Sequence, residues 1–155
     1  MNIYKVLVVG CGTMGGQIAI QTALCGYQVY AYDLKQEMTQ KAASYAESWF
    51  AGRVKKGRLT QEESAAAQDR LVFTNDLPLA AEEADLVVEA VPDVAEIKRA
   101  VLAHVDQYVP ERAFYSSNSS YLVSSVFAGA VRHPERVANL HFFNPALVME
   151  LVEVV

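Results

Sequence analysis

The chain has 155 residues, of which 52% are hydrophobic and 20% are charged, and its formal net charge is −5. This length fits one globular domain, so we expect a single domain over residues 1–155, and the composition excludes a disordered chain. The acidic balance argues against a nucleic-acid partner, which a protein usually binds through a basic face. Cys11 and Cys25 belong to no CxxC or Cys/His cluster, so we expect neither a metal site nor a disulfide framework.

The first residues contain no signal-peptide pattern. Their apolar run ends at Gly10, far short of the about 20 residues that a membrane-spanning helix needs. We therefore expect a cytoplasmic protein with reduced thiols and no membrane partner.

Strand-like and helix-like segments alternate along the chain. We expect a strand over residues 3–9, a helix over 14–25, a strand over 27–33, and helices over 35–57 and 61–69. Strands then follow over 70–76 and 84–92, a helix over 93–108, strands over 111–120 and 136–140, and finally a strand that turns back. Thr60 and Glu63 fit a capping box at the start of the third helix. The alternation predicts a doubly wound α/β fold of Rossmann type, a mostly parallel sheet with helices on both faces.

The stretch "GCGTMG" carries glycines at positions 10, 12 and 15, immediately after the first expected strand and before a helix. In that context G-x-G-x-x-G is the phosphate-binding turn of a dinucleotide site. Asp33 ends the second expected strand, where a carboxylate accepts hydrogen bonds from the adenosine ribose and repels a 2′-phosphate. The pattern favours NAD over NADP, although Lys35 lies nearby. The alternative is an ordinary strand–turn–helix with an aspartate that caps the helix.

Polar groups follow three later strands, in "EAVPD", "SSNSS" and "HFFNP". Ligands of open α/β sheets bind beyond the carboxyl ends of the strands, where these groups are expected to lie. His141 is a candidate general base, and Glu153 could orient it, because a carboxylate on the far ring nitrogen stabilises the imidazolium. Structural alternatives exist for each: a helix cap for "SSNSS", a buried histidine, and a glutamate that faces water.

The motifs "GCGTMGGQIA", "ADLVVEAVPD", "SSNSSYL" and "HFFNPALVMELVEVV" together resemble the NAD-binding domain of the 3-hydroxyacyl-CoA dehydrogenases, including 3-hydroxybutyryl-CoA dehydrogenases, over all 155 residues. The resemblance implies oxidation of a 3-hydroxyacyl-CoA in fatty acid β-oxidation or butanoate metabolism. By this resemblance His141, Glu153 and Ser120 are catalytic. The implied NAD-binding residues are Gly10, Gly12, Thr13, Met14, Gly15, Asp33, Ala90, Asp93, Lys98, Ser120 and Asn144. Ser48 and Lys56 fall near positions that contact coenzyme A.

The sequence departs from the family pattern at a few positions and in length. Ser119 replaces a common threonine and Tyr121 a common serine, and neither change removes a proposed catalytic group. Family members continue into a helical C-terminal domain that supplies dimer contacts and one wall of the acyl-CoA cleft, and it is absent from these 155 residues. Two other functions stay open: a dehydrogenase of a non-CoA hydroxy acid, and a non-catalytic NAD-binding or redox-sensing module.

Overall fold

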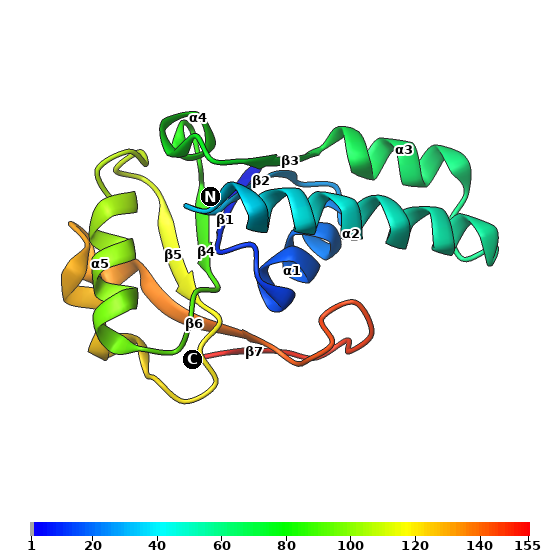
Figure 1. Cartoon of the computed structure of the whole chain (residues 1–155). Coiled ribbons are helices and arrows are strands. Elements are labelled where there is room, and N and C mark those ends of the chain that lie inside the picture. Colours follow the sequence, from blue (N-terminus) through cyan, green and yellow to red (C-terminus); the bar gives the residue numbers. More distant parts are fainter. Residues whose placement is uncertain (1) are drawn as a thin grey trace.

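The first strand, β1 (Lys5–Val9), is buried on both faces, as its continuous apolar run predicts. Leu7 packs into one apolar cluster, with side chains from α4 and α5, and Val8 packs into a second cluster on the opposite face, with side chains from α1 and α2. The computed structural model describes residues 2–155 and places β1 inside a seven-stranded sheet, as its third strand (Figure 1).

The strand order of the sheet is β3-β2-β1-β4-β5-β6-β7. The other strands are β2 (Gln28–Tyr32), β3 (Leu71–Thr74), β4 (Leu86–Glu89), β5 (Phe114–Ser117), β6 (Val137–Phe142) and β7 (Val152–Val154). All neighbours from β3 to β6 pair in parallel, and β7 returns antiparallel to β6. The order 3-2-1-4-5-6 defines the doubly wound dinucleotide-binding fold, so the predicted fold class is confirmed.

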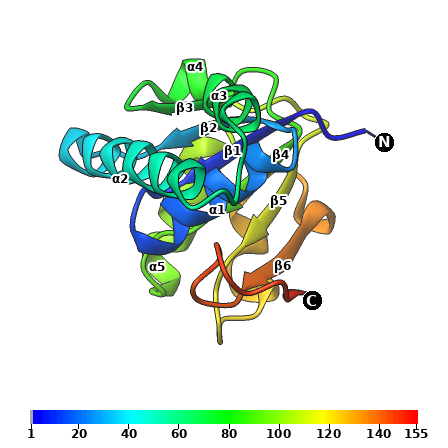
Figure 2. The same ribbon diagram turned by 90° about the vertical axis from the view of Figure 1, so that its right-hand side faces the viewer.

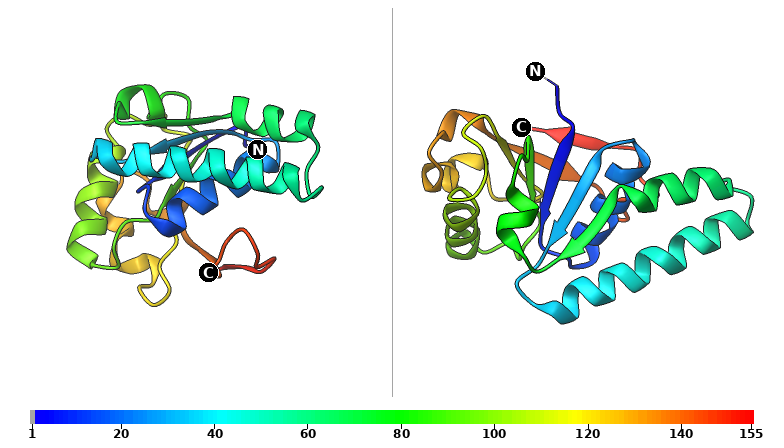
Figure 3. Two further views of the ribbon diagram at one scale, coloured as in Figure 1. Left: turned by 45° about the vertical axis from the view of Figure 1, so that its right-hand side comes forward. Right: turned by 90° about the horizontal axis from the view of Figure 1, so that it is seen from above.

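Helices cover both faces of the sheet (Figure 2). The helices α1 (Thr13–Leu24), α2 (Gln36–Lys55) and α3 (Gln61–Asp69) contact one another and lie on one face. The helices α4 (Leu77–Ala81) and α5 (Ala95–Val105) contribute to the cluster on the other face. The view from above shows α2 and α3 as a helical hairpin that extends beyond the sheet (Figure 3).

Most helices and strands begin and end within a few residues of the positions expected from the sequence. The capping box is confirmed, because the Thr60 hydroxyl accepts from the Glu63 amide at 3.1 Å and the Glu63 carboxylate accepts from the Thr60 amide at 2.8 Å. The prediction missed α4 and three 3₁₀ helices, Ser124–Val126, Ala128–Ala130 and Pro134–Arg136. These elements have only three to five residues, too few for a helical period to appear in the sequence. Within residues 2–155, no helix combines the length and apolarity of a transmembrane span.

Candidate active site

The turn after β1 carries Gly10, Gly12 and Gly15 and is the glycine turn of the protein. It lies beside the turn after β4, at the point where the strand order reverses. Gly10 has a φ of 101°, which favours glycine, and a side chain there would approach the Ala90 carbonyl oxygen to 2.9 Å. A Cβ on Gly15 would lie 1.7 Å from the Gly10 carbonyl oxygen. The first and last glycines of the motif are therefore required by packing within the turn.

Gly12, the middle glycine of the motif, is not required by packing within the turn. A Cβ on Gly12 would meet no protein atom within 4 Å and would extend into open space in front of α1. Gly12 is also the N-cap of α1, and no side chain caps the free amides of the first turn. Free amides at a helix N-terminus, with an unobstructed approach, form an anion site of the kind that binds a pyrophosphate.

A cleft of about 700 Å³ extends from this turn along the carboxyl ends of the strands. Eight of the predicted cofactor-binding residues line it: Gly10, Gly12, Thr13, Met14, Asp33, Ala90, Asp93 and Ser120. Seven further residues complete the wall: Leu34, Lys35, Met38, Val91, Pro92, Ile97 and Asn118. Val91, Pro92 and Asn118 belong to the motifs "EAVPD" and "SSNSS". Leu34, Met38 and Ile97 are apolar and lie just after a strand or in the first turn of a helix, so only that position could have indicated them.

Asp33 follows β2 and holds the glycine turn in place. One carboxylate oxygen accepts from the Cys11 amide at 2.8 Å and the other accepts from the Lys35 amide at 2.9 Å. The carboxylate also lines the cleft, where its remaining lone pairs can accept hydrogen bonds from ribose hydroxyls. Asp33 therefore supports the turn and also presents a carboxylate to the cleft.

We expect Asp33→Ala to raise the Kd of NADH about 10- to 100-fold, because the change removes a charged acceptor of the ribose and loosens the glycine turn. The Kd of NADPH should rise less, since the carboxylate no longer repels the 2′-phosphate. Fluorescence titration of both nucleotides measures this ratio. Equal losses for NADH and NADPH would contradict a role of Asp33 in selecting the nucleotide.

Beneath the cleft, Lys98 lies in a buried ionic cluster. Its Nζ is 2.8 Å and 2.9 Å from the two carboxylate oxygens of Glu89 and 3.0 Å from the Asp93 carboxylate. Lys98 and Glu89 are 1% and 0% exposed, and Glu89 also accepts from the Ser117 hydroxyl at 2.6 Å. Burial alone would raise the pKa of the Asp93 carboxyl, but hydrogen bonds from Lys98 and Ser119 and the charge of Lys98 lower it below its usual value. The cluster fixes the loops after β4 and β5.

The strands β6 and β7 bring the predicted catalytic residues together. His141 and Glu153 are register partners across the antiparallel pair, and a Glu153 carboxylate oxygen lies 3.5 Å from His141 Nδ1. On the other side of the ring, the Ser120 hydroxyl lies 3.1 Å from His141 Nε2. A substrate oxygen placed beside Ser120 would therefore lie within reach of the imidazole.

The loop that carries Ser120 is anchored at several points. Asn118 accepts from the Phe142 amide at 2.8 Å, which joins the loop to β6. Tyr121 donates to the Asp93 carbonyl, and the Ser119 hydroxyl accepts from the Leu122 amide at 2.9 Å. The tyrosine that departs from the family pattern thus ties the loop after β5 to the loop after β4.

Several predicted residues lie outside the cleft wall. Gly15 packs within the turn, and Lys98 is enclosed by its carboxylate partners. Asn144 is exposed in the turn between β6 and β7. Ser48 is exposed on α2, and Lys56 forms the C-cap of that helix. The structure thus separates a cofactor cleft from the predicted coenzyme A contacts on α2.

The doubly wound sheet, the open phosphate turn and the carboxylate after β2 define the chain as a dinucleotide-binding domain of the dehydrogenase type. The family described as "3-hydroxyacyl-CoA dehydrogenase, NAD binding domain" matches residues 5–155, and the chain belongs to that family. NAD is therefore the cofactor, and the space in front of Gly12 and the acceptor at Asp33 fit it.

Three relatives illustrate the similarity. The chain is 39% identical to 3-hydroxyadipyl-CoA dehydrogenase of Escherichia coli K12, over 100% of this chain and 32% of that protein. It is 38% identical to the fatty acid oxidation complex subunit alpha of Pseudomonas savastanoi pv. phaseolicola, over 99% of this chain and 21% of that protein. The crystal structure of 3-hydroxybutyryl-CoA dehydrogenase from Escherichia coli K12 superposes with a TM-score of 0.94 at 39% identity, covering 99% of this chain and 32% of that chain. The chain thus spans a third or less of each of these relatives.

Proposed function

We propose that this chain is the NAD-binding part of an enzyme that oxidises the 3-hydroxyl of a 3-hydroxyacyl-CoA to the ketone, reversibly. The observation that carries the proposal is the line of Ser120, His141 and Glu153 next to the cofactor cleft, with separations of 3.1 Å and 3.5 Å. An alcohol dehydrogenation needs a base for the hydroxyl proton, and histidine suits this role near neutral pH.

Each residue of the line has a role in the proposed reaction. Bound NAD supplies the hydride acceptor. Ser120 donates a hydrogen bond to the substrate oxygen and holds it near Nε2 of His141, which takes the hydroxyl proton. Glu153, beside Nδ1, stabilises the resulting imidazolium. In the reverse direction the protonated imidazole returns the proton to the ketone oxygen.

The substrate class rests on the relatives and on α2. The three relatives described above are named for CoA-ester dehydrogenation or fatty acid oxidation. Ser48 and Lys56 on α2 would contact coenzyme A, with Lys56 offering a cation to its phosphates. The chain spans a third or less of these relatives. In the proposed enzyme a further domain forms the opposite wall of the acyl cleft and the dimer contacts, and the enzyme acts in the cytoplasm.

We expect residues 1–155 alone to bind NADH but to reduce acetoacetyl-CoA slowly. The His141 and Glu153 side chains are 20% and 60% exposed, so water would screen the charge that develops on the imidazole. The measurement compares NADH oxidation by the 155-residue chain and by the longest natural form of the protein. Turnover by the short chain at the same rate as by the longest form would contradict this expectation.

The test of the substrate class compares acetoacetyl-CoA with free acetoacetate in the longest natural form. We expect kcat/KM to be at least about 100-fold higher for the CoA ester, because binding energy from the remote part of a substrate is used at the reacting centre. Lys56→Ala should raise KM for the ester and leave that for acetoacetate unchanged. Equal kcat/KM values would favour a dehydrogenase of a small hydroxy acid, and no turnover of either substrate would favour a binding or sensing module.

A further inference from the structure

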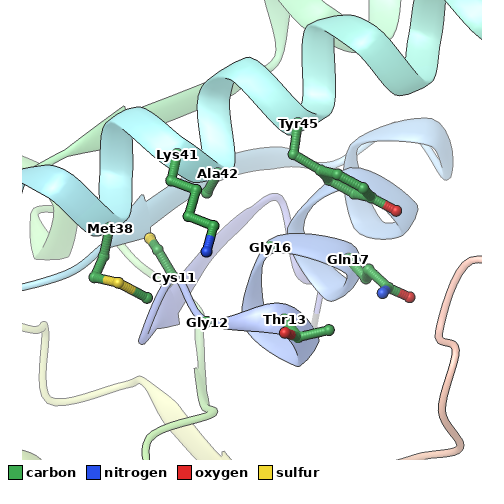
Figure 4. Close-up of a pocket in the computed structure, with 9 residues that line it drawn as sticks. All are labelled: Cys11, Gly12, Thr13, Gly16, Gln17, Met38, Lys41, Ala42 and Tyr45. Atoms are coloured by element: carbon green, nitrogen blue, oxygen red, sulfur yellow. The ribbon is translucent and has the colours of Figure 1, made fainter.

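A narrow crevice of about 190 Å³ lies between α1 and α2, on the α2 side of the glycine turn (Figure 4). Cys11, Gly12 and Thr13 form one wall, and Met38, Lys41 and Tyr45 of α2 form part of the other. Three of these residues, Gly12, Thr13 and Met38, also line the cofactor cleft. The crevice and the cofactor cleft therefore meet at the glycine turn.

Lys41 is the cation of this crevice. Its side chain extends from α2 across the crevice toward the turn at Gly12 and the first turn of α1 (Figure 4). Lys41 is exposed, and no ion pair found among residues 2–155 includes its ammonium group. The charge of Lys41 is thus available to a ligand.

The positive charge that the glycine turn itself offers is smaller than the negative charge of a dinucleotide pyrophosphate. The N-terminus of α1 offers the equivalent of about half a positive charge, whereas a dinucleotide pyrophosphate carries two negative charges. The first turn of α1, "TMGG", has no basic side chain. Of the charged residues that line the cleft, Asp33 and Asp93 are acidic and Lys35 alone is basic, and Asp93 is paired with the buried Lys98. Cys11 in the crevice wall adds no negative charge, because its thiol stays protonated near neutral pH. Burial and, to a lesser degree, the charge of Asp33 raise the pKa of this thiol to about 12.

We propose that Lys41 is a phosphate-binding residue of the NAD site, whose ammonium group contacts the pyrophosphate from the α2 side of the glycine turn. A lysine binds phosphate as a mobile point charge, and its flexible stem lets it reach a ligand from a helix at the rim. The proposal concerns cofactor binding and is independent of the substrate and of the role of His141.

The test measures binding of three ligands to the 155-residue chain by titration calorimetry: NADH, ADP-ribose and adenosine. Lys41→Gln should raise the Kd of NADH and of ADP-ribose by about 3- to 10-fold, which is the range for an exposed charge-assisted contact. The Kd of adenosine, which has no phosphate, should change less than about 2-fold. The loss should shrink in 0.5 M NaCl because salt screens exposed charges.

Two variants control for general effects. Lys55→Gln removes the same charge from the same helix, 14 residues further on and about 21 Å away along its axis, and should leave the Kd of NADH within about 2-fold. Lys41→Arg should restore most of the affinity. An unchanged Kd of NADH in Lys41→Gln, an equal loss for adenosine, or an equal loss in Lys55→Gln would each overturn the proposal. The absence of NADH binding by the unmutated chain would overturn it as well.

Discussion

Gly12→Ala is expected to fold as the unmutated chain does and to bind NADH at least about 100-fold more weakly, a loss of about 2.7 kcal/mol. The added Cβ meets no protein atom within 4 Å, so it costs the fold little. The methyl group would instead occupy the space through which the pyrophosphate approaches the amides of α1. Fluorescence titration with NADH measures the loss, and urea unfolding measures the stability.

Gly15→Ala provides the matched control, because the same methyl group is added three residues away. Its Cβ would lie 1.7 Å from the Gly10 carbonyl oxygen, a backbone atom that cannot move without opening the turn. We expect a loss of about 3 kcal/mol or more in the free energy of unfolding. If Gly12→Ala kept its affinity for NADH, or if it lost stability as Gly15→Ala does, the assignment of Gly12 to the phosphate approach would be wrong.

His141→Gln is expected to lower kcat for 3-hydroxyacyl-CoA oxidation about 10²- to 10⁴-fold in the longest natural form of the protein, which is the usual contribution of a general base. The Kd of NADH should stay within about 2-fold, because His141 is not among the residues that line the cofactor cleft. Steady-state kinetics and NADH titration on one preparation separate the two quantities.

Glu153→Gln should have a smaller effect on kcat, about 10- to 100-fold. Glu153 is 60% exposed and 3.5 Å from the ring, so solvent screens part of its interaction with the imidazolium.

A normal kcat in His141→Gln would exclude His141 as the base. A loss of kcat in His141→Gln that was matched by lost NADH binding would instead indicate a structural role.

The sequence was sufficient to predict the fold and the turn at which the cleft begins. The apolar run of β1, the glycines after it and Asp33 after β2 together identify the doubly wound sheet and its phosphate turn, because each residue type is required by local geometry. The returning strand was also predictable, because the twelve residues from His141 to Glu153 are enough for the chain to reverse direction. The register that pairs His141 with Glu153 came only with the structure.

Other features depend on contacts between distant segments and leave no local signal. The family resemblance places Lys98 among the NAD-binding residues, and only the structure shows that it is buried between Glu89 and Asp93. The tie from Tyr121 to the Asp93 carbonyl joins residues 28 positions apart. Lys41 is one of several cations in an amphipathic helix, and only the packing of α2 against α1 distinguishes it from the others.

The pH dependence of kcat/KM in both directions tests most directly whether His141 is the base. Oxidation requires a neutral imidazole and should therefore fall as the pH is lowered, whereas reduction requires the protonated ring and should fall as the pH is raised. We predict that kcat/KM for oxidation falls at low pH in the unmutated enzyme, and that the residual activity of His141→Gln lacks the bend at which this fall begins. An oxidation profile of the unmutated enzyme that does not fall at low pH, or a bend that survives in His141→Gln, would contradict His141 as the base.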